Sequence, residues 1–425
     1  PKGLSAAQEA VPEIGEYGWP QYGAAAELKS LKLQAGRHTV ADVQEFGGND
    51  DDFLAQYPKV NVVRRSEALA VKETIREMVV VNLLPSLNRK SKPGIPWQRI
   101  ATDIGDLLDH HEELLVDVVV DRVYKLAHTD PEEIRKMTSE ELVQGGFVDP
   151  VRLFVKGEPH SQKKLQAGRY RLISNRSVAD QLVERVFAGP QNTAEILLWD
   201  QIPSKPGIGF TDDMIDRLRA DVESLGEICA TDIQGWDWSV QGFELDWEAH
   251  ARIRLMKGAT AAMTNLVANS IRALSFSVFV LSDGRMYAQR VPGIMKSGSY
   301  LTSSSNSRIR TRLAWARGAK ARAMGDDCLE QTLGDTREEV DQHYTKHGHT
   351  VKDYTSFDGS FEFCSHLYEN GVAWPVSWPK SLFRLLHATD DHAMRLDQFQ
   401  EELRHCPHLS RALDALGRSG WNRQN

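Results

Sequence analysis

Aspartates in two short motifs are the residues of this chain best suited to chemistry. Asp232 and Asp237 lie in the segment Thr-Asp-Ile-Gln-Gly-Trp-Asp-Trp-Ser, and Asp326 and Asp327 follow Gly325. Gathered around one point, such carboxylates would hold the two divalent metal ions that nucleotidyl transfer requires. Magnesium prefers hard oxygen ligands. We therefore predict that Asp232 and Asp326 bind two Mg²⁺ ions, that Asp327 lies behind them as a further ligand, and that Mn²⁺ substitutes.

A polar element separates the two aspartate motifs. Ser297-Gly298, Thr302 and Asn306 follow the pattern Ser-Gly-x-x-x-Thr-x-x-x-Asn. With Asp237, their donors and acceptors could bind a ribose 2′-hydroxyl, the group that distinguishes RNA from DNA. Such a site rejects the deoxy analogue because its own polar groups would be left unpaired. Helix capping by a Ser- and Thr-rich segment is the alternative for these residues.

Basic residues are clustered although the net charge is -8. The segment from Lys156 to Arg171 resembles a basic hairpin that could bind an incoming triphosphate and template phosphates, with Arg171 making a bidentate contact. A solvated charged loop is the alternative. Two further basic stretches occupy residues 89–99 and 308–322. Basic tracks in an acidic protein predict a channel that holds a polyanion.

Hydrophobic patterning predicts the elements that must position these residues. A strand over 228–233 ends beside Asp232, and a strand–turn–strand hairpin over 323–329 carries Asp326 and Asp327 at its tip. Residues 1–60 are expected to form an extended, partly irregular arm. Short strands are predicted over 153–156 and 170–174, a hairpin over 276–291, and helices over 65–84, 103–127, 131–144, 179–187, 245–269, 302–319, 337–347 and from 379 onward.

Composition is that of an ordinary globular chain with ample core material. The 425 residues are 41% hydrophobic and 26% charged. The four cysteines show no paired spacing, which argues against a disulfide framework. No apolar run approaches membrane-spanning length, and no basic-then-apolar leader opens the sequence.

Taken in order, the motifs resemble those of the right-handed palm polymerases, and among them the RNA-dependent RNA polymerases of positive-strand RNA viruses. The resemblance runs from about Ser91 to Trp374. Three segments are similar to the sobemovirus and polerovirus group in particular: 14–20 (Ile-Gly-Glu-Tyr-Gly-Trp-Pro), 154–160 (Phe-Val-Lys-Gly-Glu-Pro-His) and 293–298 (Gly-Ile-Met-Lys-Ser-Gly).

This resemblance implies roles for individual residues. Catalysis would fall to Asp232, Asp326, Asp327 and Lys352, the last as general acid with Lys346 as the alternative. Nucleotide and ribose binding would fall to Asp237, Ser297, Gly298, Thr302, Asn306, Lys156 and Arg171. Template RNA would contact Ser91, Pro93, Gly94, Lys163, Lys164 and Arg169. The primer grip would be formed by Phe363, Cys364 and Ser365.

The implied fold is α+β: a right hand of fingers, palm and thumb, with an antiparallel palm sheet carrying the catalytic aspartates. Expected divisions are an arm bridging fingers to thumb (1–60), fingers (61–225), palm (226–244 and 293–364), an insertion between fingers and palm (245–292) and thumb (365–425).

The implied activity is RNA-templated RNA synthesis from ribonucleoside triphosphates, replicating a positive-strand viral genome. Partners would be template and product RNA, a genome-linked viral protein and other replication proteins. The resemblance also implies origin from a polyprotein and a place in membrane-associated replication complexes in the host cytoplasm, with membranes contacted indirectly.

Two other functions compete with this interpretation. A reverse transcriptase shares the palm, but that class usually has a bulky aromatic residue where this chain has Asp237, and an aromatic-rich turn where Met324-Gly325 stands. A non-catalytic RNA-binding scaffold has no need to keep Asp232, Asp326 and Asp327, which repel one another.

Overall fold

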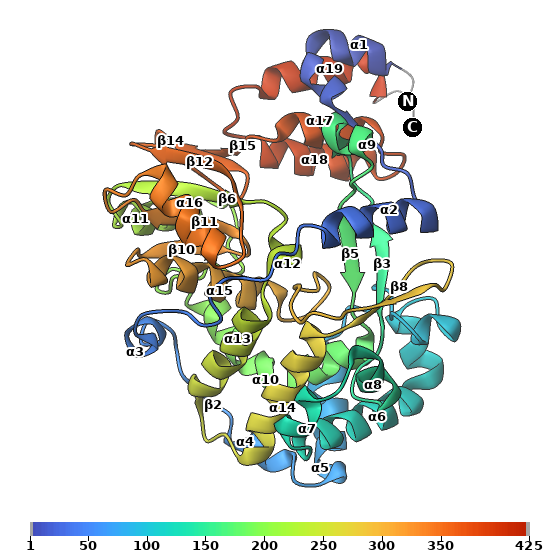
Figure 1. Ribbon diagram of the computed structural model, residues 1–425. Coiled ribbons are helices and arrows are strands. Elements are labelled where there is room, and N and C mark those ends of the chain that lie inside the picture. The colour runs from blue at the N-terminus through green and yellow to red at the C-terminus, as the bar shows by residue number, and fades with distance from the viewer. Residues whose placement is uncertain (1–2, 422–425) are drawn as a thin grey trace.

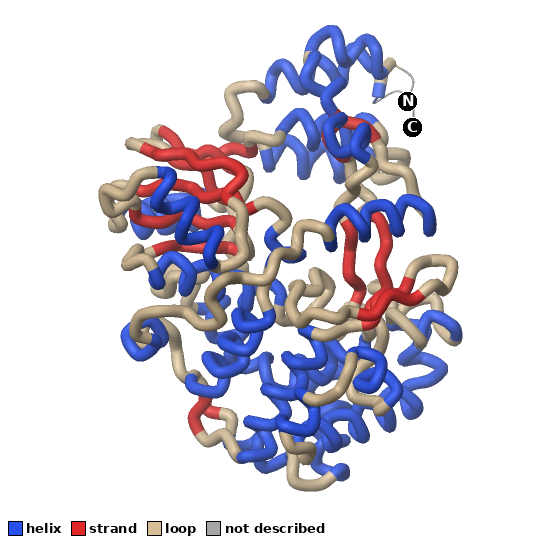
Figure 2. The backbone as a smooth tube through the Cα atoms, in the orientation of Figure 1, coloured by secondary structure: helices blue, strands red, loops and turns tan. Residues whose placement is uncertain are grey.

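The computed structural model of the chain describes residues 3–421 as a mixture of helices and several small sheets. In Figure 1 a sheet of four strands lies on one side, a second four-stranded sheet lies on the other, a helical body lies below, and the C-terminal helices lie above. Figure 2 shows the same separation, with strands confined mainly to the two flanks. Residues from all these parts meet at the site described below.

The helical body holds the largest hydrophobic core. Leu107, Val119 and Leu182 are among its fully buried side chains. Its helices are α4 (Val63–Ala68), α5 (Lys72–Met78), η2 (Val79–Leu83), η3 (Leu84–Ser86), η4 (Trp97–Arg99), α6 (Ile104–Ala127), α7 (Pro131–Arg135), α8 (Ser139–Gln144), α10 (Val178–Leu197), α13 (Gly242–Arg254) and α14 (Ala261–Ser275).

A four-stranded antiparallel sheet carries the aspartate motifs. Its order is β10 (Ala321–Met324), β11 (Asp327–Gln331), β6 (Ile228–Ile233) and β12 (Val351–Phe357). Central strand β6 pairs Ala230 with Leu329 on one side and Asp232 with Asp353 on the other. Helices α11 (Asp212–Glu223), α12 (Trp236–Ser239), α15 (Thr302–Ala316) and α16 (Arg337–Lys346) accompany it. The strand over 228–233 and the hairpin around Gly325 are confirmed.

The second four-stranded sheet has the order β5 (Leu172–Asn175), β3 (Val151–Val155), β8 (Val278–Val280) and β9 (Met286–Ala288). Helix α2 (Ala24–Ala35) lies beside β3 and β5 (Figure 1), and its Leu31 shares a core with Leu153 and Phe279. The predicted hairpin over 276–291 is present as the antiparallel pair β8–β9.

The two ends of the described chain pack together. Helix α1 (Leu4–Ala10) contacts α19 (Leu409–Ser419), and Ala7 is buried with Leu382 and Leu416. Turn η1 (Pro12–Glu16) and strand β1 (Tyr17–Gly18) follow, and β1 pairs with β4 (His160–Ser161). The C-terminal part also contains α17 (Trp378–Leu386), α18 (His392–Glu402) and the small sheet β13 (Phe361–Phe363), β14 (His366–Glu369) and β15 (Val372–Pro375).

Five expectations about local structure were wrong. The single helices predicted over 65–84 and 131–144 are broken, the first into α4, α5, η2 and η3 and the second into α7 and α8. Residues 1–60 contain α1, α2 and α3 (Asp50–Leu54), so this segment is not an irregular arm. The single helix over 245–269 is two helices, because β7 (Met256–Lys257) interrupts it to pair with β2 (Val60–Asn61). The basic hairpin contains a further helix, α9 (Gln162–Ala167), whose N-terminus is capped by the Ser161 hydroxyl.

Two further features bear on the chain's environment. None of the helices in residues 3–421 is long and apolar enough to cross a bilayer. All four cysteines are free thiols, and Cys229, Cys328 and Cys406 are buried.

Candidate active site

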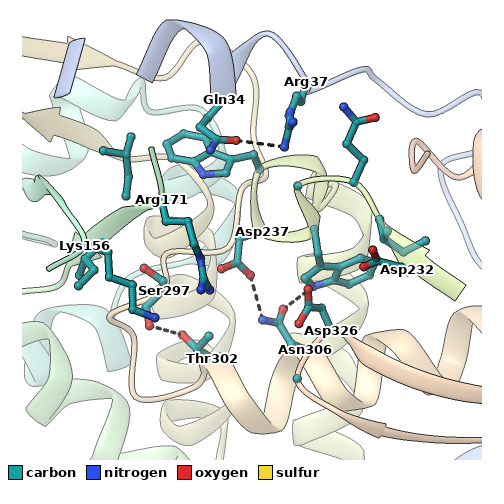
Figure 3. Close-up of a pocket in the computed structure, with 18 of the residues that line it drawn as sticks. Gln34, Arg37, Lys156, Arg171, Asp232, Asp237, Ser297, Thr302, Asn306 and Asp326 are labelled. Carbon is teal, nitrogen blue, oxygen red and sulfur yellow. Dashed lines mark hydrogen bonds between the residues drawn. The ribbon is translucent and has the colours of Figure 1, made fainter. Parts of the chain in front are cut away.

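A pocket of about 800 Å³ opens between the two four-stranded sheets. Figure 3 shows Asp232 and Asp326 on one side of it, Lys156 and Arg171 on the other, and Asp237 between them. Its remaining predicted residues are Lys164, Arg169, Ser297, Thr302, Asn306 and Lys352. The fold therefore gathers residues that are spread over about half of the chain.

Two of the predicted metal ligands face this pocket and the third does not. Asp232 lies near the end of β6, and Asp326 lies in the turn that precedes β11. Both line the pocket. Asp327 is not part of the pocket lining, and its Oδ2 accepts a hydrogen bond from the Cys364 amide at 2.6 Å. In this arrangement Asp327 holds the 361–365 turn against the sheet.

Arg310, a fully buried residue of α15, connects the backbone around both pocket aspartates. Its Nε donates to the Asp326 carbonyl at 3.0 Å, and its Nη2 donates to the Thr231 carbonyl at 2.8 Å. The third nitrogen donates to the Tyr344 hydroxyl at 2.8 Å. The turn is fixed from the same helix, because the Gly325 amide donates to the Ser307 hydroxyl at 2.8 Å. One helix therefore sets the spacing of the two carboxylate-bearing segments.

Burial and mutual repulsion raise the pKa values of Asp232, Asp237 and Asp327. Burial, with the Asp326 charge, raises the pKa of Asp237 to about 7. Burial also raises the pKa of Asp327 to about 6, although the hydrogen bond from the Cys364 amide acts to lower it. The pKa of Asp232 is raised by burial and by Asp353 and Asp326, while Lys352 opposes the shift. A bound cation would relieve this repulsion.

The donor set fits magnesium in part. Among residues 3–421 no three His, Cys, Asp or Glu side chains converge as a preformed metal site. Two carboxylates facing one pocket still suit Mg²⁺, which takes one or two of them and fills its other positions with water and substrate phosphates. Asp232 and Asp326 would hold the ions. Direct ligation by Asp327 stays a prediction.

Asn306 and Asp237 form a rigid polar pair in the pocket. The Trp236 indole N–H donates to Asn306 Oδ1 at 2.9 Å, which turns the amide N–H₂ toward Asp237 Oδ1 at 3.0 Å (Figure 3). Trp236 is itself stacked on His349, with ring centroids 4.5 Å apart. His349 Nε2 donates to the Glu244 carboxylate at 2.8 Å, and its Nδ1 lies 2.7 Å from the Ser239 hydroxyl. This set presents fixed hydrogen-bonding groups without needing substrate to organise it.

Ser297, Gly298 and Thr302 shape the loop before α15. The Ser174 amide donates to the Ser297 hydroxyl at 3.0 Å. A Cβ on Gly298 would lie 2.5 Å from the Ser174 carbonyl oxygen, so only glycine fits. The Thr302 hydroxyl is 3.2 Å from the Ser297 carbonyl. Ser297 and Thr302 also line the pocket, whereas α15 has Leu301 as its N-cap residue and no side-chain cap, so the helix-capping alternative was wrong.

Cations of the predicted nucleotide motif form the opposite wall. Glu158 lies within 2.7 Å of Arg171, 3.7 Å of Lys156 and 3.5 Å of Lys380 from α17. Burial and neighbouring cations lower the pKa of Lys164 to about 8. The repulsion among these lysines and arginines indicates that Glu158 does not neutralise all of the positive charge on this wall.

The predicted general acid and its alternative lie in different places. Lys352 lines the pocket beside Asp232, whose pKa it lowers. Lys346 lines a separate cavity with Val43 and Ala316. The geometry therefore favours Lys352 of the two.

Several predicted contacts are outside this pocket. Ser91, Pro93 and Gly94 form the loop that packs on the start of α10, where the Val178 amide donates to the Pro93 carbonyl at 2.9 Å. Lys163 is exposed on α9 and faces away from the pocket lining. Their template contacts stay predictions.

The predicted primer-grip turn lies against the same sheet. Phe363 is buried in the core beneath β11. Cys364 and Ser365 both adopt positive φ, 53° and 57°, which makes the tight turn between β13 and β14. The Cys364 contact to Asp327 ties this turn to the aspartate motif.

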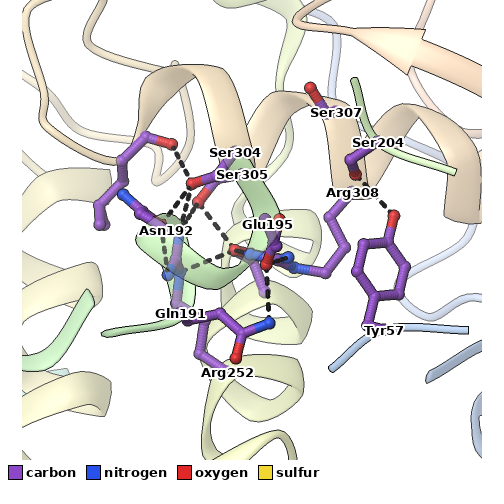
Figure 4. Close-up of polar contacts among 12 residues, drawn as sticks. Tyr57, Gln191, Asn192, Glu195, Ser204, Arg252, Ser304, Ser305, Ser307 and Arg308 are labelled. Carbon is purple, nitrogen blue, oxygen red and sulfur yellow. Dashed lines mark hydrogen bonds and ion pairs between the residues drawn. The ribbon is translucent and has the colours of Figure 1, made fainter. Parts of the chain in front are cut away.

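The prediction that the basic stretch over 308–322 helps to form a polyanion channel was wrong. Arg308, Arg310 and Arg312 are fully buried. Arg308 pairs with Glu195 and with Glu248 at 2.8 Å, within the network of Figure 4. Arg312 pairs with Asp50 at 2.8 Å. These arginines hold the interior together.

Sequence reasoning missed two residues of the pocket. Gln34 and Arg37, at the end of α2 and just beyond it, line the wall above Gly235 (Figure 3). The available signal was weak, since Arg37 stands in Ala-Gly-Arg-His-Thr, a segment without any recognised motif.

Comparison with known proteins places this geometry in a family. The family described as viral RNA-directed RNA-polymerase matches residues 84–378. The chain belongs to this family. It is 40% identical over 391 residues to the replicase polyprotein P2AB of Southern bean mosaic virus, covering 88% of this chain and 40% of that protein. It is 38% identical to protein P1-P2 of Potato leafroll virus, covering 88% and 37%.

A shorter relative is covered more fully. The RNA-directed RNA polymerase of Mushroom bacilliform virus is 38% identical over 327 residues, covering 73% of this chain and 76% of that protein. The chain spans less than half the length of replicase polyprotein P2AB and of protein P1-P2. The resemblance to sobemovirus and polerovirus polymerases is confirmed.

Proposed function

We propose that this viral polymerase-family chain synthesises RNA on an RNA template from ribonucleoside triphosphates by two-metal nucleotidyl transfer. One observation carries the proposal. Asp232 and Asp326 face a wall of cations across one pocket, and the fixed Asn306–Asp237 pair lies between them. The cations would bind the triphosphate, the Asn306–Asp237 pair would bind the ribose, and Asp232 and Asp326 would bind the metal ions, in the order in which these groups follow one another in a bound nucleotide.

The proposed fold is the right hand. Sheet β10-β11-β6-β12 would be the palm, residues 61–225 the fingers and 365–425 the thumb. Support comes from the contacts of the N-terminal residues, which pack on α19 through α1 and pair with β4 through β1, as a bridge between fingers and thumb would.

In the proposed reaction the chain's own residues bind and orient. Arg171 and Lys156 would hold the triphosphate, and Asn306 and Asp237 would bind the ribose hydroxyls. Asp232 and Asp326 would hold the two metal ions, whose chemistry when bound would be activation of the 3′-hydroxyl and neutralisation of the pyrophosphate. Lys352, on β12 beside Asp232, would give its proton to the leaving pyrophosphate.

The surroundings of the reaction are proposals as well. Template and product RNA would be direct partners, and a genome-linked viral protein and other replication proteins would join them. The expected location is the host cytoplasm, in membrane-associated replication complexes. The names of the relatives support a replicase context, because three of them are called replicase polyproteins.

The test is incorporation of labelled ribonucleotide on a homopolymeric RNA template with Mg²⁺, first without and then with an oligonucleotide primer. The matched variant is Asp326→Asn, and the control is Asp358→Asn on an exposed loop. Asp326→Asn should lower incorporation at least about 1000-fold while RNA binding is kept. Activity in that variant would refute the metal assignment. No product from the parent with any primer would refute the polymerase.

A further inference from the structure

A short segment of the N-terminal region forms the roof of the pocket, and we call residues 30–41 the roof segment. On one side the Ser30 hydroxyl donates to the Gly168 carbonyl at 3.1 Å, and Gln34 Nε2 donates to the Tyr170 carbonyl at 3.3 Å. These contacts attach the roof segment to the basic wall.

The other side of the roof segment is attached to the loop after β6. His38 Nδ1 lies 2.8 Å from the Trp238 carbonyl, and the Ala41 amide donates to Gln241 Oε1 at 2.9 Å. The segment therefore spans from the cationic wall to the loop that follows Asp232. Arg37 lies in the middle of this span.

Arg37 points into the pocket and has no acid of its own there. Its guanidinium contacts Gln34 Oε1 at 3.5 Å, and the side chain passes so close to Gly235 that a Cβ there would lie 2.9 Å from it. Within residues 3–421 no carboxylate pairs with it. Burial and the nearby Arg169 lower its pKa, which shows that its surroundings disfavour the charge.

Such a cation is costly unless something anionic binds beside it. Arg171 and Lys156 have Glu158 as a partner in the free protein, whereas Arg37, Arg169 and Lys352 face the pocket without one among the described residues. Arg37 and Arg169 line one pocket and repel each other. Two such arginines suit phosphate oxygens, since guanidinium donates to them in a bidentate fashion.

We infer that Arg37 is a phosphate-binding residue of the nucleotide site, and that the roof segment contributes it to the triphosphate of the incoming nucleotide. This rests on the proposed function. The triphosphate is favoured over an RNA backbone phosphate because Arg37 lies over Gly235, three residues from Asp232, and beside Arg169 of the nucleotide motif.

The experiment compares Arg37→Ala and Arg37→Lys with Lys32→Ala, which removes an exposed cation of α2 that does not line the pocket. Arg37→Ala should raise KM for the nucleotide by about 10- to 100-fold, the value of one charge-assisted contact, with kcat changed less than about threefold. Arg37→Lys should recover part of this loss. Lys32→Ala should match the parent.

Two binding measurements keep the inference separate from polymerase activity. Calorimetry with Mg²⁺-nucleotide and with inorganic triphosphate should show Kd raised by the same factor in Arg37→Ala, whether or not the protein incorporates nucleotide. Kd for single-stranded RNA should be unchanged. Unchanged nucleotide and triphosphate binding would overturn the inference. Weaker RNA binding with unchanged nucleotide binding would overturn it too, because Arg37 would then contact the RNA backbone.

Discussion

The interior around α15 and the pocket beside it use the same kinds of charge in opposite ways. Arg308 on α15 is enclosed with Glu195 and Glu248, and each of its nitrogens has an acceptor (Figure 4). In the pocket, Asp232 and Asp326 stand on one wall, and the cations around them include Arg37 and Arg169, which pair with no carboxylate among residues 3–421. The interior is balanced in itself, whereas under the proposed function the charges of the pocket would be balanced by bound metal and polyphosphate.

The contrast explains why one group of charges should set stability and the other should set activity. Removing one member of a buried pair leaves its partner uncompensated in a medium of low dielectric. Removing a pocket charge relieves repulsion in the free protein and weakens only binding. Predictions can therefore test the two regions against each other.

The largest expected effect is on the stability of Arg308→Ala. The change leaves Glu195 buried without its cation, and Glu248 with Arg252 alone, so the free energy of unfolding should fall by about 3–5 kcal/mol. Urea denaturation measures this. The matched pocket variant is Arg169→Ala, which should change the free energy of unfolding by less than about 0.5 kcal/mol. Equal losses in the two variants would erase the distinction between the regions.

A smaller effect should follow from breaking the Asn306–Asp237 pair of the pocket. Asn306→Ala removes the donor to Asp237 and the acceptor of Trp236. Discrimination between ribo- and deoxyribonucleotides should fall on the order of 100-fold, because the 2′-hydroxyl loses its fixed partners. The ratio of kcat/KM for the two nucleotides reports it. Ser303→Ala, another pocket-lining change, is the control, and unchanged discrimination in Asn306→Ala would exclude the pair from ribose selection.

The acids of the pocket should make stability depend on pH. Burial raises the pKa of Asp237 to about 7, above the pKa of an aspartate in the unfolded chain. As pH rises, the folded state therefore stays protonated to a higher pH than the unfolded state. Stability contributed by the protonated form is then lost as pH rises from about 4 to about 7. Asp237→Asn should remove this loss, gaining about 2 kcal/mol over the parent between pH 5 and pH 8.

Denaturation curves at pH 5 and pH 8 measure that gain. Asp358→Asn, on an exposed loop, should show no pH-dependent difference from the parent. A constant difference between Asp237→Asn and the parent at both pH values would mean that Asp237 titrates normally.

The smallest effect should come from the exposed cation Lys163 on α9. If it contacts an RNA phosphate, Lys163→Ala should reduce the slope of log K against log salt by about 1 and weaken binding several-fold at low salt. Filter binding over a salt series checks this. Lys136→Ala, an exposed lysine of the helical body, is the control, and identical slopes for both variants would remove Lys163 from the RNA path.

Local pattern was enough to predict the strands that carry the aspartates. Residues 228–233 form an apolar strand, and Met324-Gly325 marks a turn between two apolar segments, so Asp232 and Asp326 could be placed at strand ends. The ribose pair also followed, because Asn306 and Asp237 come from recognisable motifs.

The burial of a charged residue could not be predicted where its partner lies far away in the sequence. The 308–322 stretch is basic in sequence, but the partners of Arg308 and Arg312 lie 60 and 262 positions away. Nothing near them in the chain indicates that they are buried. Arg37 was missed for the same reason, because the Gly235 contact that defines its place joins segments about half a chain apart.

The packing of α1 on α19 has a consequence for how the chain reaches this structure. Arg411 and Glu13 bond across 398 positions, and Ala7 is buried together with Leu382 and Leu416 of the C-terminal helices. A ribosome makes α1 before α19, so α1 lacks this partner until the residues between the two helices have been made. Closing so long a loop is slow. The roof segment follows α1 by some twenty residues, so the pocket should be the last part of the molecule to become ordered.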